Sequence, residues 1–207
     1  MNNLKSTLFA LVATIVMTSS SLAFEGFSIG ITGSDASFDT SGKELKGIAG
    51  GTSEVSKASK SSDVDFGSGF IEYSFAQGST IGMSYIPGEA SLGAKSRTQT
   101  QTNSQNASGT VTAKAEVSDH MTFYVEPTFM LTDTFGVFVK GGAARVTVNS
   151  LESQTSTTIA STYGNQDVYG TVQGVGAKMY YGNFFAKLEH TETEYGTVTL
   201  TSSTGNL

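Results

Sequence analysis

Apolar and polar residues alternate along most of the chain with a period of two positions. One such run has Ile71, Tyr73 and Phe75 at alternate positions. A later run has Val175, Ala177, Met179 and Tyr181 at alternate positions. Successive side chains of a β-strand point to opposite faces, so the alternation is typical of strands with one apolar face, and the 3.6-residue period of an amphipathic helix is absent. The alternation predicts seven strands, at residues 24–34, 63–76, 79–87, 110–131, 135–150, 167–181 and 184–200.

The connections between these strands alternate in length. The short turns lie at residues 76–79, 132–134 and 182–183, and the long polar connections at 35–62, 88–109 and 151–166. This order is typical of outer-membrane barrels, which have short periplasmic turns and long outer loops. A soluble sandwich or lipocalin-like barrel also alternates, but its apolar residues point inward and its turns need not alternate in length.

Aromatic residues stand beside the short turns, as in the girdle that flanks a membrane-spanning barrel. They are Phe75, Phe129, Phe135, Tyr181 and Phe184. We therefore predict an all-β fold, an antiparallel up-and-down transmembrane β-barrel of eight-stranded type, with seven strands visible in this chain.

The odd strand number conflicts with this architecture. Single-chain bacterial barrels have an even number of strands, and a seven-stranded sheet would leave two edges with unsatisfied backbone groups in lipid. The residues after 200 read as the start of another long loop. We expect a closing strand of about ten residues to be missing from the chain. The alternatives are a strand hidden in 43–62 or closure by another chain.

The first 23 residues read as a secretory signal peptide. Lys5 precedes an apolar run at 8–17, and the small residues Ser21 and Ala23 stand at the −3 and −1 positions of a cut before Phe24. Ten apolar residues are too few for a membrane-spanning helix. We predict residues 1–23 as a signal peptide and 24–207 as one barrel domain in the bacterial outer membrane. No other stretch is apolar enough for a membrane helix, so membrane entry would require a closed barrel.

Composition narrows the classes of function. Charged residues make up 14% of the chain, aromatic residues 10%, and Cys and Trp are absent. The aromatic content argues against disorder, and the lack of Cys excludes disulfides and thiolate zinc sites. The net charge of −6 makes nucleic acid an unexpected partner, because phosphate binding needs a basic surface.

The alternation also predicts charges inside the barrel. If the apolar face contacts lipid, six charged residues face the lumen: Glu72, Glu126, Lys140, Lys178, Lys187 and Glu189. The interior of a small barrel is just wide enough for side chains to fill it, so three acids and three bases should pair across it. We interpret them as a packed polar core in preference to a selectivity filter.

Two polar clusters contain residue types that occur in metal or catalytic sites. His190, Glu192 and Glu194 would share one face of a strand at a spacing of about 6.5–7 Å, which is wide for a single ion and favours an acidic rim. His120 follows Ser118 and Asp119, but neighbouring residues of a strand point to opposite faces. The sequence therefore predicts no catalytic residue, no metal site and no cofactor.

Two segments resemble strand–turn–strand units of small bacterial outer-membrane barrels, the OmpA/OmpX/opacity-type group. They are 119–146 (DHMTFYVEPTFMLTDTFGVFVKGGAARV) and 178–198 (KMYYGNFFAKLEHTETEYGTV). The resemblance implies an eight-stranded fold and a structural or surface-interacting role without catalysis. Members of the group usually end in an aromatic residue, whereas this chain ends in Asn206 and Leu207. This difference adds to the expectation of a missing closing strand.

We therefore predict a non-enzymatic outer-membrane protein with a structural or adhesive role. Its partners would be outer-membrane lipid and lipopolysaccharide, and an extracellular ligand could bind the segments 35–62, 88–109 and 151–166. The first alternative is a narrow porin-like channel for ions or small solutes. The second is a lipid-modifying enzyme embedded in the barrel, which would need a Ser or His constellation at one rim.

Overall fold

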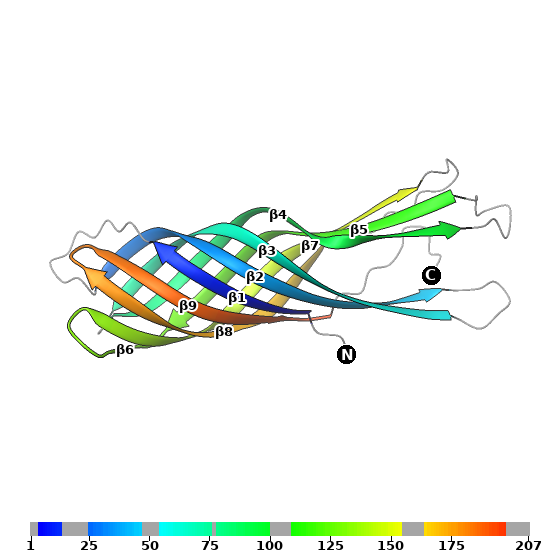
Figure 1. Cartoon of the computed structure of the whole chain (residues 1–207). Helices are drawn as coiled ribbons and strands as arrows, with labels where there is room; N and C mark the ends of the chain where they lie inside the picture. Colours follow the sequence, from blue (N-terminus) through cyan, green and yellow to red (C-terminus); the bar gives the residue numbers. More distant parts are fainter. Residues whose placement is uncertain are drawn as a thin grey trace.

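The computed structural model describes residues 4–13, 25–46, 54–75, 78–99, 109–154 and 164–197. These residues form nine β-strands (Figure 1). The strands are β1 Leu4–Ala13, β2 Gly26–Lys46, β3 Glu54–Phe75, β4 Ser79–Gln99, β5 Gly109–Glu126, β6 Thr128–Met130, β7 Phe135–Gln154, β8 Gln166–Tyr181 and β9 Phe184–Tyr195. Among the described residues, no helix is long and apolar enough to cross a membrane.

The strands form one antiparallel sheet that closes on itself. Its order is β5-β4-β3-β2-β1-β9-β8-β7-β6, and β5 also pairs with β7. Because β5 and β6 pair with successive parts of β7, β6 continues β5 beyond Pro127. Proline has no N–H, yet its carbonyl still accepts a hydrogen bond from the Val139 N–H at 3.2 Å. The nine strands thus occupy eight positions, which confirms the predicted all-β, up-and-down barrel of eight-stranded type.

The closing position of the barrel lies between β2 and β9, where β1 pairs with both neighbours. Residues 5–13 pair antiparallel with 31–39 of β2, and residues 4–13 with 186–195 of β9. The seven predicted strands correspond to β2 through β9, with β5 and β6 counted together. The sequence did not predict β1, because its apolar run lacks the period of two. The segment 43–62 adds no position to the described sheet, because its described residues belong to β2 and β3.

The expectation that 35–62, 88–109 and 151–166 are loops is wrong for most of their described residues. The β2–β3 ladder continues to the pair Lys46 and Glu54, and the β4–β5 ladder to Gln99 and Gly109. Strand β7 continues to Gln154. Only 47–53, 100–108 and 155–163 fall outside the described residues.

The physical reason is that these extensions are mostly polar, with scattered apolar residues such as Ala36 and Leu92, so no sustained apolar alternation marks them. An antiparallel ladder needs only backbone partners, and cross-strand hydroxyl contacts add to it. Ser96 Oγ lies 2.8 Å from Thr112 Oγ1, and Thr40 Oγ1 donates a hydrogen bond to the Lys60 carbonyl at 3.1 Å.

The barrel wall divides where these extensions begin. Pairing between β3 and β4 ends at Gly69 and Tyr85, although both strands continue. Two β-bulges interrupt β4 just beyond this point, and Gly88 (φ 96°) and Gly93 (φ 127°) supply the positive φ that their backbone adopts. The β2–β3 hairpin and the ends of β4, β5 and β7 therefore project separately from the same end of the barrel (Figure 1).

Candidate functional site

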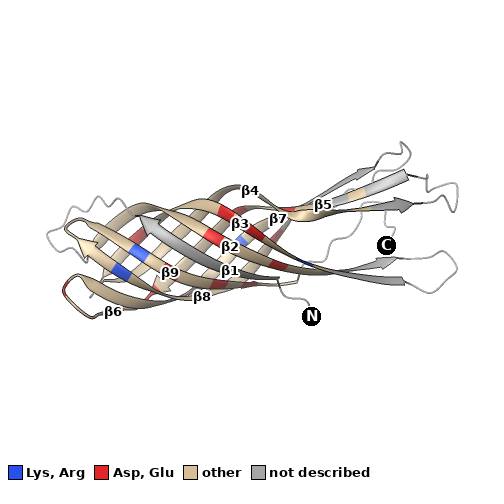
Figure 2. Cartoon of the chain, in the orientation of Figure 1, with Lys and Arg blue, Asp and Glu red and all other residues tan. Residues whose placement is uncertain are grey.

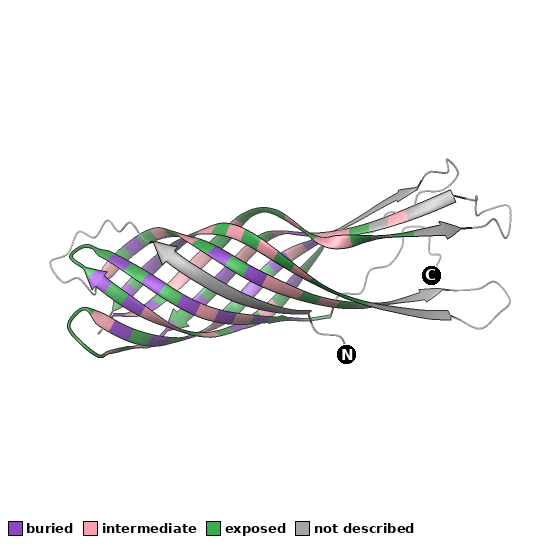
Figure 3. Cartoon of the chain, in the orientation of Figure 1, coloured by how far each residue is buried: buried purple, intermediate pink, exposed green. Residues whose placement is uncertain are grey.

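The two faces of the barrel wall have opposite character, and buried and exposed residues alternate along the strands (Figure 3). The outer face carries large exposed apolar side chains, such as Phe27 at 65% and Tyr181 at 84% exposure. We call this set the apolar belt. Its members are Phe27, Ile29, Ile31, Ile71, Tyr73, Phe75, Ile81, Tyr85, Phe123, Val125, Phe129, Leu131, Val137, Val139, Tyr169, Val175, Met179, Tyr181, Phe184 and Leu188. The inner face instead buries full charges, the reverse of a water-soluble barrel.

The height of the belt can be judged from strand register. Directly paired positions form a row that joins Tyr85, Met121, Arg145 and Tyr169 at its outer edge. From Tyr169 to Tyr181, β8 advances twelve positions. At ~3.3 Å per residue and a tilt of ~40°, this is a height of ~30 Å, which is close to the hydrocarbon core of a bilayer.

Polar pairs gather at and above this outer row. Arg145 forms an ion pair with Asp167 at 2.8 Å, and the Tyr85 hydroxyl donates to Asp119 Oδ1 at 3.0 Å. Farther out, Asp35 lies directly opposite Asp65, and a hydrogen bond with that carboxyl raises the pKa of Asp35 above its usual value. Exposed pairs of polar or charged side chains therefore begin where the apolar belt ends.

The six charged residues expected in the lumen are all buried inside the barrel and lie at one level, which we call the charged layer. They come from five strands: Glu72 from β3, Glu126 from β5, Lys140 from β7, Lys178 from β8, and Lys187 and Glu189 from β9. Figure 2 shows acidic and basic positions distributed over several strands of the barrel wall. Their formal charges sum to zero.

Glu126 is the centre of the charged layer. Its side chain is 0% exposed, and its carboxylate contacts the ammonium groups of Lys178 at 2.6 Å, Lys187 at 3.1 Å and Lys140 at 3.2 Å. Lys187 also pairs with Glu72, and Lys140 with Glu189 at 2.7 Å. Because a buried charge without a partner is strongly unfavourable, each member depends on the others.

Aromatic and hydroxyl groups complete the coordination of these charges. Tyr124 donates a hydrogen bond to Glu72 Oε1 at 2.7 Å, and its ring lies 4.1 Å from the Lys140 ammonium. Lys178 donates to Thr80 Oγ1 at 2.7 Å and lies 4.8 Å from the Phe138 ring centre. Sequence reasoning missed these partners. The signal was present, because Tyr124 and Phe138 stand two positions from Glu126 and Lys140 and so share their face.

Apolar clusters fill the bore on both sides of the charged layer. Toward the short turns lies the inner cluster, Phe70, Tyr180 and Phe185 with Met130 packed against it. Toward the projecting hairpins lies the outer cluster, which consists of Val117, Ala144, Val146, Val148, Val168, Val172 and Tyr195, with Ala90 and Leu92 packed against it. A water-filled pore would expose these side chains, whereas each cluster residue is less than 9% exposed.

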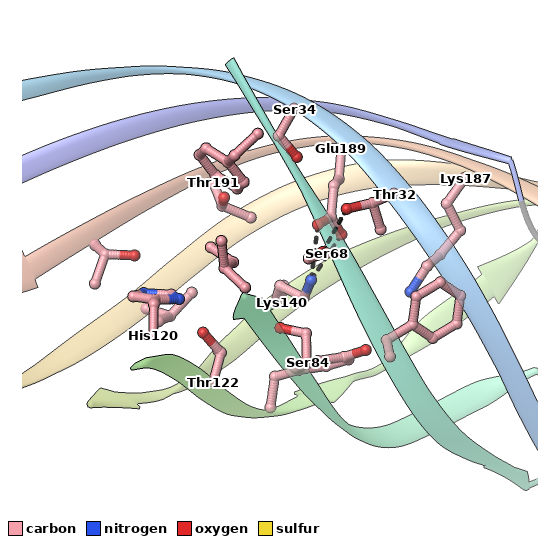
Figure 4. A pocket seen from close by; sticks show the side chains of 16 residues that line it. Thr32, Ser34, Ser68, Ser84, His120, Thr122, Lys140, Lys187, Glu189 and Thr191 are labelled. Carbon is pink, nitrogen blue, oxygen red and sulfur yellow. Dashed lines mark hydrogen bonds and ion pairs between the residues drawn. The ribbon is translucent and has the colours of Figure 1, made fainter. Parts of the chain in front are cut away.

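A small polar cavity of about 50 Å³ lies in the barrel interior beside the charged layer (Figure 4). Hydroxyl groups from several strands line it, among them those of Thr32, Ser68 and Thr122, together with the Lys140–Glu189 ion pair. At about 10–15 Å³ per water, the cavity has room for about four water molecules. This volume suits internal hydration better than a substrate.

The histidine-containing segments do not form a catalytic or metal constellation. His120 lines the cavity, whereas Asp119 lies exposed at a bulge with φ 52° and accepts hydrogen bonds from Tyr85 and Ser118. Glu192 and Glu194 alternate on β9 with buried Thr191 and Thr193, which puts them on the outer face. Within the described residues, no group of three or more potential ligands is placed to hold a metal ion.

Comparison with known proteins gives no relative: no family model matches the chain, and no curated protein or solved structure is significantly similar to it.

Proposed function

We propose that the protein is a non-enzymatic β-barrel of the bacterial outer membrane with a structural or surface-interaction role. The observation that carries this proposal is the inverted polarity of the wall, with the apolar belt outside and the charged layer inside. In water, exposing twenty large apolar side chains while burying six charges would be unfavourable on both counts. In a bilayer both arrangements are favourable, and the belt height of ~30 Å matches the hydrocarbon thickness.

The two ends of the barrel support an assignment of sides. One end has the short turns at Gly182 and at residues 131–134, and the other has the projecting hairpins. Outer-membrane barrels have their short turns in the periplasm. The hairpin ends would therefore meet the exterior and supply the surface for lipopolysaccharide or an extracellular ligand.

A surface role is better supported than a channel. The charged layer is internally paired, and the inner and outer clusters fill the bore on both sides of it. An ion would have to break buried ion pairs and pass between packed Val and Phe side chains. The narrow channel remains the second candidate, with the polar cavity as its only supporting feature in the described residues.

Topology can be tested by thiol labelling, because the chain has no native Cys. Ser41 and Asn183 are both exposed and lie at opposite ends of the barrel, so Ser41→Cys and Asn183→Cys form a matched pair. On intact Gram-negative cells that express the protein, an impermeant maleimide should label Ser41→Cys, and Asn183→Cys only after lysis. Equal labelling of both variants on intact cells, or recovery of the protein in the soluble fraction, would contradict the proposal.

A further inference from the structure

The polar cavity beside the charged layer carries hydrogen-bonding groups that have no partner among the described residues (Figure 4). Two of its hydroxyl groups, those of Thr32 and Ser68, bond to each other at 2.5 Å. Within the described part of the chain, no hydrogen bond is formed by the side chains of Ser34, Ser84, Thr122, Thr191 and Thr193. The Nδ1 atom of His120, which also lines the cavity, has no partner either. Because buried polar groups are hydrogen-bonded as a rule, these groups point to a bound molecule.

The charges that line the cavity are already paired. Lys140 donates to both carboxylate oxygens of Glu189, at 2.9 and 2.7 Å. Lys187 pairs with Glu72 and Glu126. Because the charged layer is neutral as a set, a charged ligand would be buried without a counter-charge, which is strongly unfavourable. An apolar ligand would leave the hydroxyl groups unbonded. The lining therefore favours a neutral molecule that both donates and accepts hydrogen bonds, as hydroxyl groups do.

The volume of the cavity sets the size of this molecule. At about 50 Å³, the cavity is too small for a substrate of ordinary size, but the space of about four water molecules also admits a solute of about four non-hydrogen atoms. A two-carbon diol has this size and carries a hydroxyl group at each end. The cavity offers it partners on separate strands, such as Thr32 on β2, Thr122 on β5 and Thr191 on β9.

Beside the cavity, two neighbouring strands of the barrel wall are no longer paired. The last backbone pair of β3 and β4 joins Gly69 and Tyr85, although both strands continue outward. Three residues that line the cavity lie just beyond this pair, namely Phe66 and Ser68 on β3 and Ile86 on β4. The cavity therefore reaches the wall at a point where no backbone ladder between β3 and β4 closes it.

The unpaired stretch of the wall is bounded at both ends. At its outer end Lys60 of β3 lies against Gly93 of β4, where an added Cβ would be 2.5 Å from the Lys60 Nζ. Its inner end is at Tyr85, in the row that marks the outer edge of the apolar belt. A polar molecule thus reaches this stretch without crossing the hydrocarbon core. The route along the bore is instead filled by the outer cluster, whose member Val172 lines the cavity.

We propose that the cavity is a binding site for a neutral, hydroxylated molecule of about four non-hydrogen atoms, which enters from the side between β3 and β4. The site requires the closed barrel but not its location in the outer membrane. It therefore goes beyond the proposed function, and its failure would leave that function standing.

Binding is tested with ethane-1,2-diol on the whole chain in lipid nanodiscs, with the threonine methyl groups labelled for NMR. The resonances of the cavity residues Thr32, Thr122, Thr191 and Thr193 should shift saturably. The dissociation constant should be on the order of 10 mM, as expected for so small a ligand. The exposed Thr132 in the short turn is the internal control and should not shift. Glucose, which is too large for the cavity, should shift none of these resonances.

Two probes with the same number of non-hydrogen atoms separate hydroxyl content from charge. Propan-1-ol lacks one hydroxyl group, and protonated 2-aminoethanol replaces one by an ammonium group. Each should bind roughly tenfold more weakly than the diol. Neither comparison needs a substitution, so both remain valid if a variant fails to fold.

Substitutions then test the lining itself. Thr122→Val with Thr191→Val removes two cavity hydroxyls at nearly equal shape and should weaken diol binding roughly tenfold, as read at Thr32 and Thr193. Thr171→Val, which removes an exposed hydroxyl of β8, is the matched control and should leave binding unchanged.

The side entrance is tested by the exchange rate of the bound diol, measured from NMR line shapes. Phe66→Ala with Ile86→Ala trims the cavity where β3 and β4 separate, and should raise the exchange rate roughly tenfold. Val117→Ala with Val148→Ala trims the outer cluster instead and should leave the rate unchanged.

Each part of the proposal has a result that overturns it. If no cavity threonine shifts saturably with the diol, the cavity holds water only and the site is wrong. Tighter binding of 2-aminoethanol than of the diol would contradict the neutral class of ligand. Faster exchange in the valine pair alone would show entry along the bore. None of these results bears on membrane location, which the labelling of Ser41→Cys and Asn183→Cys tests separately.

Discussion

At the scale of single residues, the charged layer sets the strictest requirement, because each of its buried charges must keep a partner. Glu126 has no exposed surface and contacts three ammonium groups within 3.2 Å. Water compensates poorly for the loss of its charge, because apolar clusters pack on both sides of the layer and the cavity beside it has room for only about four water molecules. The energetic consequence is that the layer is stable only as a neutral set.

Glu126→Gln should therefore lower the free energy of unfolding by about 3–5 kcal/mol, as expected for a buried ion pair that loses one partner. Urea unfolding in lipid vesicles measures this change. Glu89→Gln, which removes an exposed acid of β4, is the matched control and should cost less than about 0.5 kcal/mol. Adding Lys178→Met to Glu126→Gln should recover part of the loss, because neutrality returns. Equal costs for both Gln variants would contradict the account.

The pair Asp35 and Asp65 gives a prediction on pH. The hydrogen bond between the two carboxyls raises the pKa of Asp35 above its ordinary value of 3.8. Because the folded-state pKa of Asp35 is raised, protonation of Asp35 stabilises the β2–β3 pairing. This stabilisation is fully present below pH 3.8 and is lost as the pH rises through the folded-state pKa. Carboxyl-carbon NMR should show the upward shift in Asp35, and Asp65→Asn should reduce it. An ordinary Asp35 titration in the parent protein would contradict the predicted pairing.

At the scale of elements, the bulges of β4 separate the projecting hairpins from the barrel. Gly88 and Gly141 both have open space around an added Cβ, but only Gly88 has a positive φ, of 96°. Gly88→Ala should therefore destabilise the protein by about 1–2 kcal/mol through backbone strain. Gly141→Ala should be neutral or slightly stabilising. Thermal or urea unfolding compares the two, and an equal effect would show that φ is not the cause.

The strands of the barrel could be predicted from the sequence wherever one face is apolar. Residues such as Ile71 and Tyr73 contact the outer environment while Glu72 faces inward. Apolar and polar residues therefore alternate in the sequence with a period of two. The same alternation identified all six residues of the charged layer. It could not identify their individual partners, because which Lys meets Glu126 depends on the register and tilt of distant strands.

Two features could not be predicted for opposite reasons. The extensions of β2, β3 and β4 are mostly polar, so their ladders leave no sustained pattern of hydrophobicity. The apolar run at 8–17 has no period of two, so the ladders of β1 with β2 and β9 leave no pattern either, and the run reads as an export signal. In both cases backbone pairing defines the strand, and backbone pairing cannot be detected from the alternation of apolar and polar residues.

At the scale of the whole molecule, the filled bore predicts that the protein does not conduct. Planar bilayers containing the refolded protein should show no stepwise current, because ion pairs and packed apolar clusters occupy the lumen. A steady single-channel conductance that disappears with Lys140→Gln would instead support the channel. The exposed Lys60→Gln on the β2–β3 hairpin is the control for an effect of net charge alone.

The inverted polarity of the wall is the central claim, and single tryptophans test it most directly, because the chain has no native Trp. Trp is placed in turn at outward Ile29, Ile71, Val125 and Val175, and at inward Phe70, Tyr124, Phe138 and Phe185, in protein refolded into vesicles whose acyl chains carry bromine. We expect strong fluorescence quenching at the outward set and weak quenching at the inward set. Quenching that is equal in the two sets, or stronger at the inward positions, would contradict the claim.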